Sequence, residues 1–156
     1  MPSQPLFRAK PSLTIKRRID VPPEKIFRAW TEPEKITRWF GPEEVEVLHA
    51  ETDARVGGRY RIVARSPDGE QHDVSGTYRE VVPNEKLVFT WAWRSTPERE
   101  SLVTVLLGAD GGGTLLTLIH EQFFDEAARD RHEHGWNGSM DKLERVAPDL
   151  SRNILS

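Results

Sequence analysis

The sequence lacks cysteine, which excludes disulfide bonds, thiol catalysis and metal sites built on thiolates. It has no apolar run long enough to span a bilayer. The segment from Met1 to Phe7 lacks the apolar core of a secretion signal, so we expect a cytoplasmic protein. Basic charge is not in excess, because the formal net charge is −3. We therefore expect that neither nucleic acid nor a membrane is a partner.

The sequence also lacks the common catalytic and cofactor-binding motifs. It contains no G-x-S-x-G elbow, no Walker loop and no G-x-G-x-x-G fingerprint. The run His132-Glu133-His134 resembles metal ligands, but residues two apart point to nearly opposite sides of a helix. We therefore expect no metal and no cofactor. No paired acid and base and no activated nucleophile is evident, which favours a binding protein over an enzyme.

The length and composition of the chain indicate a single domain. The 156 residues are 37% hydrophobic and 30% charged, enough to bury roughly two-thirds of the unfolded surface in a single core. Residues 1–12 contain three prolines and little periodicity, which predicts an extended or mobile N-terminal arm. The domain is expected over residues 13–147. Residues 148–156, which begin with a proline, are expected to form a C-terminal tail.

The start of the domain predicts one strand and two short helices. Leu13, Ile15 and Ile19 give a strand with one buried side, which ends before Pro22 and Pro23. A helix carrying Ile26, Phe27 and Trp30 should follow. The run Thr31-Glu32-Pro33-Glu34 predicts a capping box, with Thr31 as the N-cap of a second helix. That helix carries Ile36, Trp39 and Phe40 and ends at Gly41-Pro42.

After Pro42 the apolar residues recur with a period of two, which is typical of half-buried strands. Runs rich in glycine, proline, aspartate or asparagine at 57–58, 66–69, 83–85 and 111–113 predict turns between antiparallel neighbours. The last two strands are expected over residues 102–107 and 114–121. The inward positions of the earlier strands are Val45 and Val47; Tyr60, Ile62 and Ala64; Val74, Gly76 and Tyr78; and Leu87, Phe89, Trp91 and Trp93.

A long amphipathic helix is expected over residues 124–147, stopped by Pro148. A helix optimised only for packing would not place His132, Gly135 and Ser139 on its apolar face, because glycine costs roughly 1 kcal/mol there and imidazole needs a partner. Such a face suits a helix that partly roofs a cavity. The inward arc, at about 100° per residue, contains Ala128, His132, Gly135, Trp136, Ser139, Leu143 and Val146.

The order of elements predicts an α+β domain whose curved antiparallel sheet of about seven strands wraps around the last helix. Six ordered blocks carry a resemblance: residues 19–31, residues 37–42, residues 53–60, two short strand blocks at 76–78 and 87–91, and His132-Glu133-His134-Gly135-Trp136 with Leu143. These blocks are similar to the activator of heat-shock protein 90 ATPase homologue-like family. This family belongs to the START-related helix-grip superfamily, usually called SRPBCC. Met140 stands at the position of a family leucine, a volume-conserving change.

The resemblance implies a helix-grip fold, of the START and Bet v 1 type, and a cavity between the sheet and the last helix. A small apolar or aromatic ligand is the partner that the wider superfamily implies. Weak contact with a bacterial-type Hsp90 chaperone is an alternative, although the chain is too short to contain the N-terminal domain of the eukaryotic cochaperone. A cyclase-like or hydrolase-like enzyme that uses a cavity histidine or tyrosine is a second alternative. The chain is expected to be a monomer or a homodimer.

The candidate ligand-binding residues come from the inward positions. Aromatic side chains there could line a pocket, or they could simply form the core that alternating strands need. His132 could orient a ligand or act as an acid or base, or it could be a core histidine satisfied by the protein. The same alternatives apply to His120. The candidates are Trp39, Phe40, Tyr60, Tyr78, Phe89, Trp91, His120, His132, Trp136 and Met140, with Trp93 on the same face as Trp91.

Overall fold

A computed structural model describes residues 10–150, and it contains seven strands and three helices. Residues 1–9 of the expected arm (1–12) and residues 151–156 of the expected tail (148–156) lie outside the described residues. The elements in chain order are β1 (Leu13–Ile19), α1 (Pro23–Thr31), α2 (Pro33–Trp39), β2 (Glu46–Thr52), β3 (Arg59–Arg65), β4 (Gln71–Val82), β5 (Lys86–Trp93), β6 (Ser101–Asp110), β7 (Gly113–Glu121) and α3 (Glu126–Leu150).

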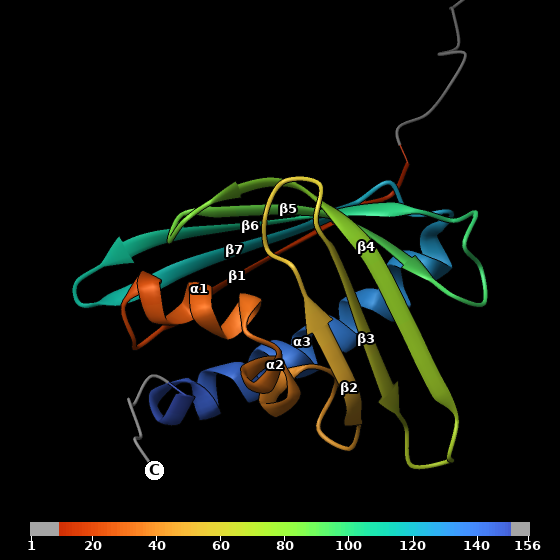
Figure 1. The fold of residues 1–156 in the computed structure, drawn as a ribbon, viewed down its shortest axis with the longest axis horizontal. Helices are drawn as coiled ribbons and strands as arrows, with labels where there is room; N and C mark the ends of the chain where they lie inside the picture. Colours follow the sequence, from red (N-terminus) through yellow and green to blue (C-terminus); the bar gives the residue numbers. More distant parts are fainter. Residues whose placement is uncertain (1–9, 151–156) are drawn as a thin grey trace, which may run out of the picture.

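The seven strands form one antiparallel sheet in the order β1-β7-β6-β5-β4-β3-β2. From β2 to β6 each strand pairs with the next strand along the chain, as the turn positions predict, and β1 pairs with β7. The sheet curves over α3, with α1 and α2 on the same concave side (Figure 1). This arrangement confirms the α+β helix-grip fold.

Two irregularities in strand pairing accompany the curvature of the sheet. The register shifts between Val47 and His49 in β2, and again between Tyr78 and Glu80 in β4. Bulges of this kind bend a strand and increase its twist, which lets a sheet wrap around a helix. Gly76 in β4 allows a further close approach, because a Cβ atom there would lie 1.9 Å from the backbone oxygen of Thr90. No other residue type fits at this position without a shift of β4 or β5.

The N-terminal cap of α2 differs from the predicted capping box. Glu32 is the N-cap residue, and it makes no capping hydrogen bond through its side chain. Thr31 ends α1 instead, with its hydroxyl donating to the backbone oxygen of Phe27 over 2.9 Å. The expected N-cap was therefore one residue early. The turn between the two helices is so short that Thr31 still completes the last turn of α1, where bonding to the carbonyl four residues back is common.

The last helix begins two residues later and ends three residues later than predicted. It runs from Glu126 to Leu150, with the carboxylate of Asp125 accepting a hydrogen bond from the backbone N–H of Ala128 over 2.8 Å. Pro148 lies inside the helix and does not stop it. An internal proline removes one backbone donor, and its ring crowds the carbonyl four residues back, so the last turn needs packing from a residue beyond it. Leu150, which is buried in the core, supplies that packing.

Charged groups fasten α3 to the first strand. Arg17 of β1 donates through its guanidinium to Asp141 over 2.8 Å and to Glu144 over 2.6 Å. It also donates to the side-chain oxygen of Asn137 over 2.9 Å. These three acceptors are at i, i+4 and i+7 along one side of the helix, so a single arginine spans two turns. This Arg17 clamp fixes one long side of α3 against the edge of the sheet.

Candidate functional site

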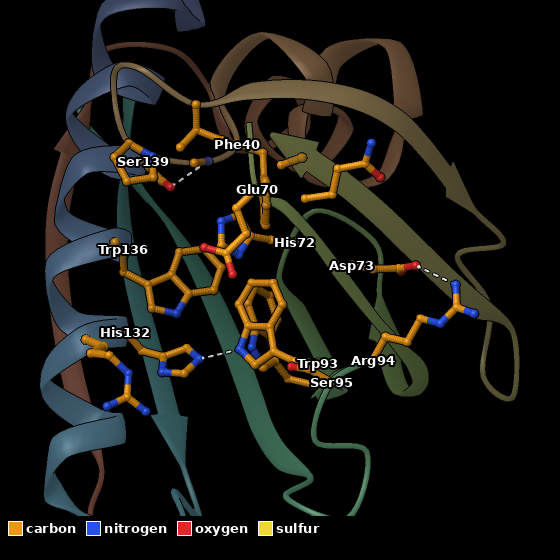
Figure 2. A pocket seen from close by; sticks show the side chains of 18 of the residues that line it. Phe40, Glu70, His72, Asp73, Trp93, Arg94, Ser95, His132, Trp136 and Ser139 are labelled. Carbon is orange, nitrogen blue, oxygen red and sulfur yellow. Dashed lines mark hydrogen bonds and ion pairs between the residues drawn. The ribbon is translucent and has the colours of Figure 1, made fainter. Parts of the chain in front are cut away.

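A cavity of about 890 Å³ opens between α3 and the end of the sheet formed by β3, β4 and β5. Figure 2 shows α3 on one side of this cavity and the strands on the other. The helix contributes Arg131, His132, Gly135, Trp136 and Ser139. The opposite wall and the rim come from Phe40, Gly41, Pro42, Val45, Ala64, Glu70, Gln71, His72, Asp73, Trp91, Trp93, Arg94, Ser95, Thr96 and Arg99. We call this space the outer cavity.

Aromatic rings form the floor of the outer cavity. Trp91 of β5 lies 5.1 Å from Trp136 of α3 and 6.1 Å from Phe40, measured between ring centroids. Trp93 meets Trp91 edge-on at 5.5 Å. Trp91 and Trp93 come from the inward positions that the alternation along β5 predicts. Gly135 also faces the cavity, because a Cβ atom added there would meet nothing within 4 Å.

His132 reaches the cavity wall with both ring nitrogens engaged by the protein. The indole N–H of Trp93 donates to Nε2 over 2.8 Å. Nδ1 lies 2.7 Å from the backbone oxygen of Ala128, so it carries the proton and donates to that oxygen. Burial lowers the pKa of His132, which is consistent with a neutral ring of this single tautomer. The ring is thus a fixed part of the wall and has no free nitrogen for a ligand.

His120 lies deeper and does not line the outer cavity. Its Nδ1 accepts from the indole N–H of Trp136 over 3.0 Å, and its Nε2 lies 2.7 Å from the hydroxyl of Ser101. Ser101 in turn donates to the backbone oxygen of Trp91 over 3.3 Å. Burial lowers the pKa of His120 well below its usual value, with the neighbouring His132 adding to the effect. The imidazole therefore connects α3 to β5 through a chain of hydrogen bonds.

Several candidates from the sequence lie beyond the aromatic floor, in the closed core. Trp39 is buried and donates through its indole to the backbone oxygen of Ala29 over 2.8 Å. The hydroxyl of Tyr60 donates to the backbone oxygen of Thr90 over 2.6 Å, and burial raises the pKa of this phenol well above its usual value. Met140 is fully buried in the same core. None of these side chains, nor those of Tyr78 and Phe89, lines the outer cavity.

A second, much smaller space lies in this core. It has a volume of about 30 Å³, and we call it the inner void. Phe40, Trp91 and Trp136 line both spaces, so these three rings separate the inner void from the outer cavity. The other residues around the inner void are Trp30, Ile36, Trp39, Thr52, Tyr60, Ile62, Tyr78 and Phe89.

Charged residues at the rim of the outer cavity were not among the candidates from the sequence. Arg94 lies 3.7 Å from Asp73 (Figure 2). Asp73 also pairs with Arg61 over 2.8 Å. The guanidinium of Arg61, together with Arg94, lowers the pKa of Asp73. Arg131 lies on the helix side and makes no ion pair with any residue from 10 to 150. Periodicity gives no signal for these positions, because they come from strand ends, a connection and the outer edge of a helix.

The segment after α2 is tied down at the cavity edge. The hydroxyl of Ser139 accepts from the backbone N–H of Gly41 over 2.9 Å. The buried ammonium of Lys142 donates to the backbone oxygen of Pro42 over 3.1 Å, and burial lowers the pKa of this group. Arg145 pairs with Glu43 over 2.9 Å. Ser139 was expected to be a small residue facing the cavity, and the structure adds this anchoring contact.

Within residues 10–150 no three acidic, histidine or cysteine side chains are grouped as a metal site would require. No helix in the same range is both long and apolar enough to cross a membrane.

Comparison with known proteins agrees with this geometry. The model of the family described as Activator of Hsp90 ATPase homolog 1-like protein matches residues 20–147. The chain belongs to this family. A comparison with curated proteins gave no match.

Solved structures of this family type share the fold over nearly the whole chain. The AHSA1 protein of Silicibacter pomeroyi is 30% identical, covers 89% of this chain and 99% of its own, and superposes with a TM-score of 0.77. A protein of Chromobacterium violaceum is 28% identical, with 87% and 96% covered and a TM-score of 0.79. One from Nitrosomonas europaea is 26% identical, with 92% and 97% covered and a TM-score of 0.78. The chain thus shares its overall fold with these structures.

Proposed function

We propose that the protein binds a small, largely apolar or aromatic molecule in the outer cavity, without chemical conversion. The observation that supports this proposal is a space of about 890 Å³ floored by indole and phenyl rings. Sites for small molecules commonly occupy 300–1,000 Å³ and combine apolar walls with a few polar groups. A ligand of two or three fused rings has room in a space of this volume.

The helix side of the cavity supports the proposal further. Gly135 leaves open space where any other residue would project a side chain, although glycine weakens a helix by about 1 kcal/mol relative to alanine. His132, which carries polar nitrogens, is neutralised and fully bonded, so it presents only the face or edge of a ring. The wall is therefore apolar where a ligand would lie against it.

The rim gives the ligand one point of charge recognition. Arg131 has no ion-pair partner among residues 10–150, and it stands at the opening beside His132. A guanidinium without a carboxylate can bind an anionic or polar group that remains at the mouth. The proposed ligand thus has an apolar body within the cavity and a polar group at the rim.

Filling the cavity from the helix tests the proposal. Gly135→Leu should project its side chain into open space and also favour the helix, so the domain should remain folded. Binding of the uncharged fluorescent probe N-phenyl-1-naphthylamine should be saturable in the unchanged protein and weaken about tenfold or more in the variant. His134→Leu adds the same side chain to the exposed side of the same helix turn and should bind the probe normally. Saturable binding that Gly135→Leu leaves unchanged would contradict the proposal.

A contact with a bacterial-type Hsp90 chaperone is the alternative that the family resemblance raises. Such a contact would use the outer surface, whereas the proposed ligand enters between α3 and the sheet. One variant therefore distinguishes ligand binding from the chaperone contact. Gly135→Leu should impair probe binding and leave a contact on the outer surface intact.

A further inference from the structure

The five tryptophans of the chain differ in how their indole N–H groups are satisfied. Three of them donate to protein acceptors: Trp39 to a backbone oxygen, Trp93 to His132 and Trp136 to His120. Trp30 and Trp91 are buried, and their indole nitrogens have no acceptor among the described residues. A buried donor without an acceptor costs about 1–3 kcal/mol, so such groups in a folded protein need an explanation.

The two unsatisfied indoles share a location. Both line the inner void, and both pack on Trp136, with centroid distances of 5.8 Å for Trp30 and 5.1 Å for Trp91. Trp91 also lines the outer cavity, so a molecule in that cavity is already in contact with one of the two rings. The two rings that carry the unsatisfied donors therefore lie at the inner end of the proposed binding site.

The surroundings of the inner void limit what can satisfy these donors. None of the side chains that line it carries a charge. Three hydroxyl groups surround it, those of Thr52, Tyr60 and Tyr78. Thr52 donates to the backbone oxygen of Thr31 and Tyr60 donates to that of Thr90, and neither indole N–H bonds to any of the three hydroxyls. An ionised carboxylate would lose its hydration there without a cation in return. The space of about 30 Å³ also admits only a group the size of one oxygen or methyl.

We infer that the inner void receives a neutral acceptor oxygen, of the ketone or ester carbonyl type, at the buried end of a flat apolar ligand. The indole N–H groups of Trp30 and Trp91 are the donors. This inference rests on the proposed function, since the body of the ligand occupies the outer cavity. It assigns a chemical class to the ligand that the apolar floor alone does not define.

The oxygen can enter only if one of the three rings that separate the two spaces moves. Trp91 and Trp136 belong to a strand and a helix, whereas Phe40 lies in the connection between α2 and β2. Phe40 packs edge-on against Trp136 at 6.4 Å. Rotation of this phenyl ring is the smallest change that joins the inner void to the outer cavity.

Two probes of matched shape test the inference. 2-Acetylnaphthalene carries a carbonyl oxygen, and 2-ethylnaphthalene has the same ring system and a similar outline without an acceptor. One hydrogen bond corresponds to about 1 kcal/mol, so the acetyl compound should bind the unchanged protein roughly fivefold more tightly, measured by quenching of tryptophan fluorescence. In ¹⁵N-correlated NMR spectra, the indole protons of Trp30 and Trp91 should move downfield with the acetyl compound and not with the ethyl compound.

Phenylalanine variants assign the effect to the two donors. Trp30→Phe and Trp91→Phe keep an aromatic ring and remove the N–H, so each should reduce the preference for the acetyl compound. Trp93→Phe is the matched control, because its N–H already serves His132, and the preference should persist in that variant. Each variant also identifies its own indole signal in the spectra.

The outcomes separate this inference from the proposed function. If neither naphthalene binds saturably, the proposed function fails and the inference fails with it. If both bind equally, or if neither compound shifts the two indole protons, the outer cavity binds apolar molecules but the inner void does not receive the oxygen. The NMR measurement uses the unchanged protein, so it decides the question even if a phenylalanine variant does not fold.

Discussion

The indole N–H of Trp93 donates to Nε2 of His132 across 2.8 Å, and this bond joins β5 to α3 at the wall of the outer cavity. Because Nδ1 of the same ring donates to Ala128, His132 is held as one neutral tautomer. The sequence left two roles open for this residue, a ligand-orienting group or a satisfied core histidine. The geometry supports the second role, and it leads to a direct test.

His132→Leu should destabilise the protein by about 1–3 kcal/mol, because the N–H of Trp93 loses its acceptor next to an apolar wall. Urea unfolding followed by circular dichroism measures the change. The double variant His132→Leu with Trp93→Phe removes donor and acceptor together and should recover part of the loss. A single variant as stable as the unchanged protein would show that this hydrogen bond contributes nothing.

Trp136→Ala should destabilise the protein by about 3–5 kcal/mol, since it removes a buried ring and leaves a cavity between α3 and the sheet. It also deprives Nδ1 of His120 of its donor. The comparison is Phe124→Ala, which truncates an exposed ring stacked on Arg99 and should change stability by about 1 kcal/mol or less. The two urea midpoints should therefore differ clearly, and equal midpoints would contradict the packing described for Trp136.

Stability should fall as the pH is lowered from about 7 to 5. The folded-state pKa values of His120 and His132 are below the usual value of 6.5, so in this range the unfolded chain takes up protons that the folded chain does not. Each fully depressed histidine contributes a slope of up to about 1.4 kcal/mol per pH unit. Urea midpoints across this range measure the slope, and His132→Leu should reduce it. A flat profile would show that neither imidazole is held neutral by the fold.

Acid effects from carboxylates should occur at lower pH. Asp73 has a pKa below its usual value because it accepts hydrogen bonds from Arg61, so its contribution is lost only below about pH 4. Asp73→Asn should therefore alter stability at neutral pH and leave the slope between pH 7 and 5 unchanged. A change of that slope in Asp73→Asn would mean that the histidines are not its source.

Gly76→Ala should destabilise the protein by about 3 kcal/mol or more, because the added methyl group would overlap the backbone oxygen of Thr90. Gly108→Ala in β6 is the matched control, since nothing lies within 4 Å of its added Cβ atom. Thermal unfolding of both variants should show a large loss for the first and little change or a gain for the second. Similar melting temperatures would mean that β4 and β5 separate easily at this point.

The fold could be predicted from the sequence because the patterns that indicate its strands, turns and helices each lie within a short stretch of residues. Alternation from Tyr60 to Trp93 gives the inward face of three strands, and the turn residues give their antiparallel order. The phase of α3 correctly placed Trp136, Ser139 and Leu143 on its buried side. The end of α3 was predicted too early, because a proline signal is local while the burial of Leu150 depends on the assembled core.

The site could be predicted only in part, because periodicity gives the face of a strand and not the depth along it. Phe89 and Trp91 lie two residues apart on the same face of β5, yet only Trp91 reaches the outer cavity. Whether Phe89 or Trp91 lines the cavity depends on where along β5 the curved sheet separates from α3. The rim arginines depend on the same curvature, so no local pattern could have identified Arg131 or Arg94.

The two long sides of α3 are held by different physics. On the β1 side the Arg17 clamp joins a guanidinium to Asp141 and Glu144, whereas on the cavity side the helix rests on Trp91. Added salt screens the first kind of contact, and urea weakens the second by solvating apolar groups. Added salt should therefore weaken mainly the contact between α3 and β1, whereas urea should weaken mainly the contact between α3 and β5.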